Sequence, residues 1–282
     1  MQYHQRRMTS FTPYLRFIRE NAPFLLVGAL LSFLSSFGQT FLIATFAGEI
    51  RSEYGLSNGD WGLIYMVATM VSAGVMVFAG GLTDRFRARS LSVIVLGCLA
   101  LSCIAMALNT HVIGLVIIIF CLRFFGQGMT STISIVSISR WFIATRGRAL
   151  AISTLGFVTA EAALPLSSVW LKSHLPWRMI WMGFAGFILL MIPLLWQLLR
   201  LERTPQATAR TDNAAGMDGK HWTRAQALRH PLFWTLAPVM ALFPMFATTF
   251  WFHQVHFAEI KGWEHLSLVA VFPLGTFTFM GS

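Results

Sequence analysis

The chain has 282 residues, of which 56% are hydrophobic and only 11% are charged, and its formal net charge is +10. Soluble domains are typically about 25% charged, so this composition excludes a soluble globular protein. The first 20 residues are polar and basic before any apolar run begins, and no secretory signal is visible. We therefore expect the first apolar segment to stay in the mature protein.

Charge-free apolar runs recur along the chain, and each is long enough for a helix of about 20 residues that crosses a bilayer. The third run is broken only by Arg123 and is too long for one helix, so we expect it to turn at 109–111. The sequence thus predicts seven membrane-spanning helices and most or all of an eighth. The runs are 21–48, 61–83, 90–139, 149–171, 179–199, 232–252 and 265–282.

Lysine and arginine are distributed unevenly between the two sides that these helices define. With a cytoplasmic N-terminus, sixteen of the 21 Lys and Arg residues fall inside, four fall outside, and Arg123 lies within the membrane. The positive-inside rule favours this orientation, which we place in a bacterial-type plasma membrane. The basic charge therefore indicates topology. Because the arginines are spread over four segments, it does not indicate nucleic-acid binding.

A polar stretch at 201–222 divides the chain. Its apolar residues follow no helical or strand periodicity, so we interpret it as a flexible cytoplasmic linker. It joins an N-terminal six-helix domain at 1–200 to the start of a C-terminal domain at 223–282. Just after it, Thr223 and Gln226 have capping-box spacing, which predicts a short surface helix before the seventh span.

Polar side chains recur at helical spacing on three predicted helices, which favours a shared hydrated interior. The amides of Gln39 and Gln127 are costly to bury unpaired, so we expect them to contact a solute. For the hydroxyls, the alternative is that they only hold helices together. The three sets are Ser32, Ser35, Ser36, Gln39 and Thr40; Tyr65, Thr69 and Ser72; and Arg123, Gln127, Thr130, Ser134 and Ser137.

The turn after the second predicted helix, GGLTDRFRARS at 80–90, resembles the loop signature of the major facilitator superfamily. Arg87 stands where the family usually has a second glycine, and Ala88 where it usually has a basic residue. The matching residues are Gly80, Leu82, Asp84, Arg85 and Arg89.

Three further segments support the resemblance. RFFGQGM at 123–129 is similar to the Arg-Gln-Gly motif of the family's fourth helix, and 140–157 resembles its loop into the fifth helix. The segment 222–234 is similar to the one before the seventh helix in oxalate/formate-type and monocarboxylate-type carriers.

The resemblance implies an all-α integral membrane protein with a six-helix N-terminal bundle and the seventh and eighth helices of a C-terminal bundle. A complete member has twelve helices, so the chain resembles a C-terminally truncated one. In the family, the loop signature latches the cytoplasmic gate, which assigns that role here to Gly80, Gly81, Asp84, Arg85 and Arg89. The two glycines predict a close approach of helices at this turn.

Two charged residues are predicted near the middle of the membrane. At about 1.5 Å per residue, Arg123 lies roughly 25 Å and Glu161 roughly 20 Å from the cytoplasmic charges. An unpaired arginine at this depth costs about 2.5 to 3.5 kcal/mol, so we expect Glu161 as its partner. One interpretation is a static ion pair between helices. The other is a switch, in which a substrate anion competes for Arg123 while Glu161 takes up a proton.

At the outer end of the seventh predicted helix, His253 and His256 are i, i+3 neighbours. Without a third ligand of clear spacing they are a weak metal signal. A hydrated helix end, pH sensing or substrate contact are the other interpretations.

These observations predict a secondary transporter, symporter or antiporter, for a small organic anion coupled to protons. We expect a monomer without a cofactor, whose partners are the lipid bilayer, the solute and protons. The expected translocation residues are Arg123, Gln39, Gln127, Tyr65, His253 and His256, with Glu161 for proton coupling.

Two other functions are open. An exporter of amphipathic drugs or metabolites is the main alternative. A membrane-embedded metal enzyme using His253, His256 and Glu259 is a remote one, because the sequence has no HExxH, GxSxG or GxxxxGK[ST] motif.

Overall fold

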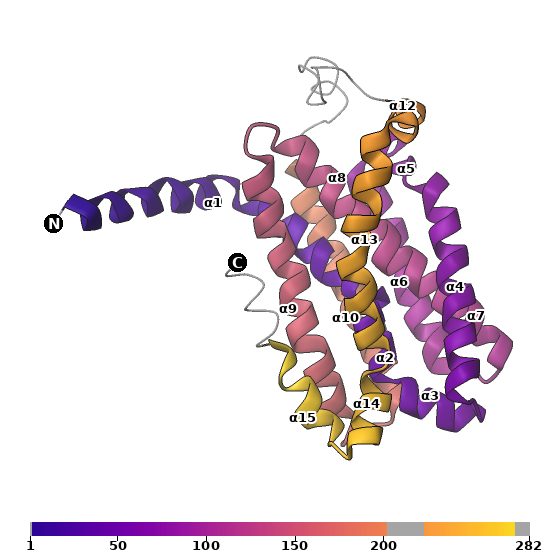
Figure 1. Cartoon of the computed structure of the whole chain (residues 1–282). Helices are drawn as coiled ribbons and strands as arrows, with labels where there is room; N and C mark the ends of the chain where they lie inside the picture. The colour runs from indigo at the N-terminus through magenta and orange to yellow at the C-terminus, as the bar shows by residue number, and fades with distance from the viewer. Residues whose placement is uncertain (1, 202–222, 274–282) are drawn as a thin grey trace.

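The computed structural model describes residues 2–201 and 223–273 (Figure 1). Within these ranges, seven helices are long and apolar enough to cross a membrane, which confirms the predicted spans. Residues 202–222 of the expected linker and 274–282 of the expected eighth span lie outside the described residues. The spans are Tyr14–Gly38, Asn58–Arg85, Ala88–Leu108, Val112–Trp141, Arg146–Lys172, Trp177–Leu198 and Pro231–Phe252.

The first apolar run is not one continuous helix. α1 (Gln2–Ser35) tightens into the 3-10 turn η1 (Ser36–Gly38), and the backbone is extended at Gln39 (φ −83°, ψ 152°). A new helix, α2 (Thr40–Thr45), follows and leads into α3 (Ala47–Tyr54). The single helical stripe expected from Ser32 to Thr40 is therefore wrong, because the helix restarts after Gln39.

The fourth span has an irregular centre as well. It consists of α7 (Val112–Cys121), a π-helix η2 (Leu122–Thr130) and α8 (Ser131–Trp141). π-Helical turns are rare and frequently occur at functional sites. The remaining elements before the linker are α4 (Asn58–Ala79), α5 (Leu82–Arg85), α6 (Ala88–Leu108), α9 (Arg146–Lys172), α10 (Trp177–Leu198) and η3 (Leu199–Leu201).

After the linker, the predicted short helix is confirmed as α12 (Arg224–Arg229), which begins with a capping box. The backbone N–H of Gln226 donates to Thr223 Oγ1 at 3.3 Å, and the N–H of Thr223 donates to Gln226 Oε1 at 2.9 Å. α13 (Pro231–Phe252) then spans the membrane, followed by α14 (Gln254–Lys261) and α15 (His265–Val269).

Small residues let the helices of the first six spans approach closely. A Cβ at Gly156 of α9 would lie only 1.9 Å from the carbonyl oxygen of Ala29 in α1. Beside this contact, three buried hydroxyls join α1, α8 and α9, with Ser134 Oγ 3.0 Å from Ser32 Oγ and 3.1 Å from Ser153 Oγ. Ser32 and Ser134 therefore hold helices together instead of lining a wet interior.

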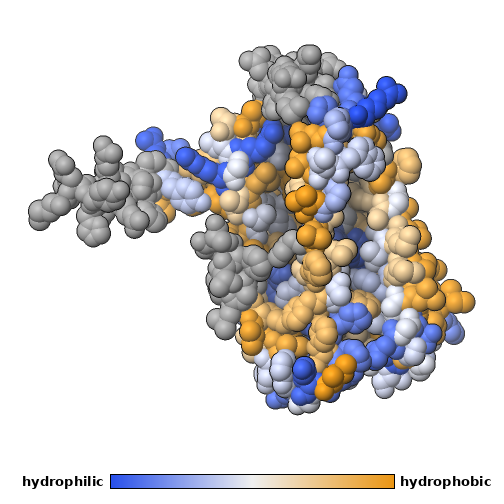
Figure 2. Space-filling view, in the orientation of Figure 1, coloured by the Kyte–Doolittle hydropathy of each residue, from blue (hydrophilic) through white to orange (hydrophobic). Residues whose placement is uncertain are grey.

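The surface has apolar sides and polar ends. Figure 2 shows hydrophobic side chains along α13 and α4, and hydrophilic ones gathered at both ends of the bundle. On α4, Met70 is 66% and Phe78 is 80% exposed, as expected of side chains that face lipid. We call the two ends the α5 end, which also carries α12, and the α3 end, which also carries α14 (Figure 1).

Candidate functional site

The two irregular segments, η1 with Gln39 and η2, pack against each other in the bundle interior. A Cβ at Gly38 would lie 2.0 Å from the carbonyl oxygen of Leu122, and one at Gly126 would lie 2.6 Å from the Cα of Gly38. Both positions thus require glycine, because the opposing atoms belong to the backbone. The contact brings the broken first span and the π-helix into one site.

Arg123 lies in η2 with only 7% of its surface exposed. Its Nη1 donates to the Gly38 carbonyl at 3.3 Å and to Thr40 Oγ1 at 2.9 Å. The guanidinium carbon is 5.6 Å from the centroid of the Tyr65 ring, within cation–π range. Nε is buried and has no hydrogen-bond partner.

Tyr65 and Thr40 complete the immediate surroundings of Arg123. The Tyr65 hydroxyl, from α4, donates to Thr40 Oγ1 at 2.9 Å, so Thr40 accepts from both residues. Both side chains are buried, at 6% and 5% exposure. The predicted residue Tyr65 therefore contacts Arg123 directly, and Thr40 joins them.

The two glutamines flank this cluster. Gln127 is half-buried in η2, and its Oε1 is buried without a hydrogen-bond partner. Gln39 is half-buried at the break before α2, and its side chain makes no hydrogen bond to a residue that the structure describes. Both amides therefore retain hydrogen-bonding capacity next to Arg123.

The structure does not bring Glu161 to Arg123. No ion pair joins them in the described part of the chain, and Arg123 is satisfied in part by a carbonyl, a hydroxyl and a ring face. Glu161 is half-buried on α9, one turn after Phe157. Phe157 packs on Phe41 of α2 with ring centroids 5.8 Å apart. The expected ion pair is thus wrong: α2 packs against α9 through Phe41, one turn before Glu161, and Arg123 bonds to α2 and Gly38 instead.

His253 and His256 lie at the α3 end. There they line a pocket together with Arg51, Asn58 and Trp61. Phe252 separates them from the interior site, with its ring 5.0 Å from His253 and 5.0 Å from Tyr65.

The histidines have a carboxylate nearby but no metal-ligand set. His256 Nδ1 is 3.7 Å from Glu259 Oε2. No group of three or more His, Cys, Asp or Glu residues within 2–201 and 223–273 is placed to hold a metal ion.

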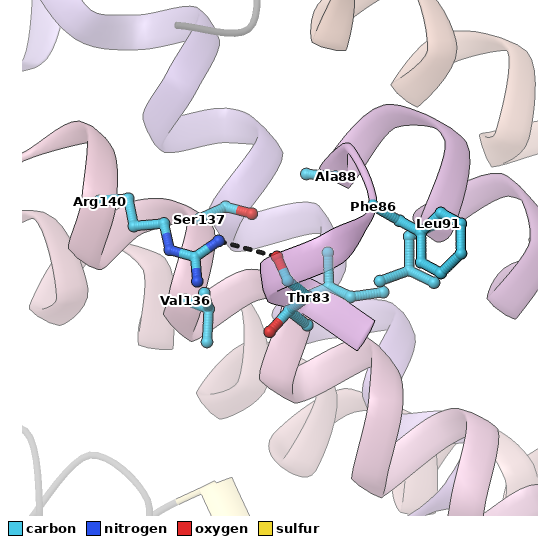
Figure 3. A pocket seen from close by; sticks show the side chains of 8 residues that line it. Thr83, Phe86, Ala88, Leu91, Val136, Ser137 and Arg140 are labelled. Atoms are coloured by element: carbon cyan, nitrogen blue, oxygen red, sulfur yellow. Dashed lines mark hydrogen bonds between the residues drawn. The ribbon is translucent and has the colours of Figure 1, made fainter. Parts of the chain in front are cut away.

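The loop signature forms the turn at the α5 end. Asp84 makes an ion pair with Arg140 of α8, whose Nη1 also donates to the Thr83 carbonyl at 2.8 Å (Figure 3). Arg140 and Thr83 line a small pocket here with Phe86 and Ser137.

The two loop glycines do not lie at a close contact between helices. Side chains at Gly80 and Gly81 would meet only ordinary contacts at 3.5 and 3.7 Å, so the close helix approach expected there is absent. Further along the loop, Arg89 donates to the Trp196 carbonyl at 3.2 Å and lies over its ring at 3.6 Å, whereas Arg85 is exposed.

Several residues of the site were missed from the sequence. Gly38 and Gly126 are the contact points of the two irregular segments, and each stands in a Phe-Gly-Gln tripeptide, at 37–39 and 125–127. The repeated tripeptide was the available signal. Gln254 was also missed: it is fully buried, and its Nε2 donates to the Phe41 carbonyl at 2.9 Å.

The apolar spans and this buried polar cluster define a multi-pass membrane protein with an internal site. The family model of the Major Facilitator Superfamily matches residues 28–282, so the chain belongs to this superfamily. It is accordingly a secondary transporter that moves a small solute across a lipid bilayer. No curated protein matches the chain significantly.

Proposed function

We propose that the solute is a small organic anion whose carboxylate binds Arg123, and that Glu161 couples its movement to protons. The observation that carries this proposal is the free edge of the Arg123 guanidinium. Only Nη1 is engaged, by Gly38 and Thr40, while Nε and Nη2 make no hydrogen bond to any described residue.

The free edge has the geometry that a carboxylate needs. Nε–H and the adjacent Nη2–H point the same way, and such a pair of parallel donors binds both oxygens of a carboxylate. Arg123 is buried, so the bond would form in a medium of low dielectric, where it is stronger than in water. The half-buried amides of Gln39 and Gln127 supply further donors and acceptors for the rest of the solute.

The charge of the site favours an anion over a cation. No acidic residue is paired with Arg123 among the residues that the structure describes, and its neighbours are neutral dipoles. A buried charge without a counter-ion is costly, and an incoming anion relieves that cost. The positive charge of Arg123 would repel an amphipathic cation, so the site does not favour an exporter of such cations.

Glu161 is the proposed proton carrier. It is half-buried in a membrane-spanning helix and has no ion-pair partner in the described ranges. Ionisable residues in such positions mark proton relays more often than structural contacts. A proton on Glu161 would accompany the anion, so that the pair crosses with no net charge.

We further propose that the α5 end faces the cytoplasm. Arg85, Arg87, Arg89 and Arg140 lie at this end, as the positive-inside rule requires. In this orientation the loop signature is a cytoplasmic gate and the pocket beside His253 and His256 opens outward. The proposed division is an N-terminal domain at 1–200, a linker at 201–222 and a C-terminal domain from 223, in a monomer.

The direct test measures uptake of radiolabelled lactate, oxalate, succinate and benzoate into proteoliposomes with Arg123→Lys and Arg123→Ala. Arg200→Lys, at an exposed arginine, is the matched control. We expect both Arg123 variants to lose uptake by about 100-fold, since a lysine cannot form the two parallel bonds. Unchanged uptake of every carboxylate in both variants would refute the anion proposal.

A further inference from the structure

The short helix α2 is held in place by side chains from other elements. It has only six residues, too few for a helix that is stable alone, and its last carbonyls lack partners within the helix. At its start, Arg123 and Tyr65 donate to Thr40 Oγ1. At its end, Lys172 Nζ of α9 donates to the Thr45 carbonyl at 2.7 Å.

A further hydrogen bond to α2 comes from Gln254 of α14. Its Nε2 donates to the Phe41 carbonyl at 2.9 Å, across 213 residues of sequence, and its Oε1 is 3.4 Å from His265 Nε2. The side chain is fully buried. A buried amide is costly unless both ends are bonded, so this contact is a specific link between α14 and α2.

A second link joins the same two parts of the chain without touching α2. Arg51 Nη2 of α3 lies 3.0 Å from Glu259 Oε1 of α14, and the Glu259 side chain is 50% exposed. Both links hold α14 against the first spans at the α3 end. Of these two links from α14, only the hydrogen bond of Gln254 reaches α2, the helix that carries Thr40.

We infer that Gln254 is a positioning residue for the transport site: it fixes α2, and through Thr40 it sets the orientation of Arg123. When α14 moves away from the first spans, the Gln254 bond to α2 breaks and the interior site changes with it. Opening of the α3 end is thereby coupled to the geometry of the site. The inference rests on the proposal that the Arg123 cluster is the transport site, but it does not depend on the nature of the solute.

The test compares Gln254→Met with Arg51→Met in the full-length protein, with the three native cysteines replaced by alanine. Two reporters are introduced separately. Ala47→Cys, at a position 4% exposed in α3, reports opening of the α3 end. Gln39→Cys, next to Thr40, reports the site. The measurement is the rate of labelling by a membrane-impermeant maleimide, with no carboxylate present.

Both substitutions should raise labelling of the Ala47→Cys reporter, because each removes one link at the α3 end. Gln254→Met should raise labelling of the Gln39→Cys reporter by about fivefold, as expected for the loss of one buried hydrogen bond. Arg51→Met should raise it less, because that variant keeps the hydrogen bond between Gln254 and α2. Equal rates at that reporter in both variants, or no change in either, would overturn the inference.

A second variant guards against misfolding. Gln254→Leu keeps most of the volume of the side chain but cannot donate to the Phe41 carbonyl, and it should give the same pattern as Gln254→Met. Protection of the Gln39→Cys reporter by lactate, oxalate or succinate tests the anion proposal separately. If these acids give no protection, the anion proposal fails and the result on Gln254 stands. If Gln254→Met does not raise labelling of the Gln39→Cys reporter, the inference about Gln254 fails and the anion proposal stands.

Discussion

In Arg178 and Arg123, the edge of the guanidinium formed by Nε and Nη2 has different surroundings. In Arg178, at the α3 end, Nε and Nη2 both contact Glu53 Oε1, at 3.0 and 2.6 Å, and Nη1 donates to the Ala107 carbonyl at 2.6 Å. The second oxygen of Glu53 accepts from Trp177 Nε1 at 2.8 Å. Each of the three guanidinium nitrogens of Arg178 therefore has a partner, and the residue ties α3 to the start of α10.

Arg123 is more deeply buried than Arg178 and yet less satisfied. The edge that Arg178 uses for Glu53 is unoccupied in Arg123, where only Nη1 is bonded. Burial is costly for a charge, so a structural arginine in this position should carry a full set of partners. Arg178 is thus saturated and stabilises the fold, whereas the unpaired edge of Arg123 is where we propose that the solute binds.

The largest effect is expected from removing the contact that holds the Arg123 site together. Gly38→Ala places a methyl group against the Leu122 carbonyl, and we expect the melting temperature to fall sharply, by the equivalent of about 3 kcal/mol or more. Gly97→Ala in α6 is the control, since a side chain there meets nothing within 4 Å. Equal melting temperatures for the two variants would show that the close backbone contact does not exist.

Substitution of Glu161 and of Glu53 should affect proton-driven accumulation differently. Glu161→Gln should abolish proton-driven accumulation of the carried anion but preserve exchange of labelled for unlabelled anion, because a neutral amide leaves the anion site intact. Glu53→Gln should retain accumulation, since its carboxyl serves only Arg178 and Trp177. Equal loss of accumulation and exchange in Glu161→Gln would indicate a structural role.

The ion pair of Arg178 predicts a pH-dependent stability. The guanidinium of Arg178, which donates to Glu53, holds the pKa of that carboxyl below its ordinary value of 4.5. Because the pKa is lowered in the folded state, the contribution of Glu53 to stability is present above about pH 4.5 and disappears as the pH falls through the folded pKa.

Glu53→Gln should therefore lower the melting temperature at pH 7 by the equivalent of about 1 kcal/mol, as is typical of a partly exposed charged hydrogen bond. The deficit should shrink as the pH is lowered from 5 to 3. A deficit that stays constant over this range would show that Glu53 does not titrate against Arg178.

The smallest effect concerns the support of Arg123. Thr40→Val removes the hydroxyl that accepts from Arg123 and Tyr65, and we expect carboxylate affinity to fall about fivefold. Thr45→Val, which removes a hydroxyl bonded to the Phe41 carbonyl at 2.8 Å, is the matched control in the same helix. Identical affinities in the two variants would count against Thr40 as the support.

The spans were predictable because apolar length is a local property, and the observed helices follow the apolar runs closely. Arg123 was also predictable, as a lone charge in such a run. Its partners were not: helical periodicity assumes a regular helix, and the break at Gln39 and the π-helix at 122–130 shift side chains off the expected faces. Glu161 was assigned by depth alone, and depth does not show which side chains of neighbouring helices come together.

Binding of a carboxylate to the unpaired edge of Arg123 can be measured with the purified full-length protein. Isothermal titration with lactate, oxalate, succinate and benzoate would be compared for the unmodified protein, Arg123→Lys and Arg178→Lys. We expect at least one acid to bind the unmodified protein and Arg178→Lys alike, and to bind Arg123→Lys about 30-fold or more weakly. Equal affinity for the unmodified protein and Arg123→Lys would contradict it.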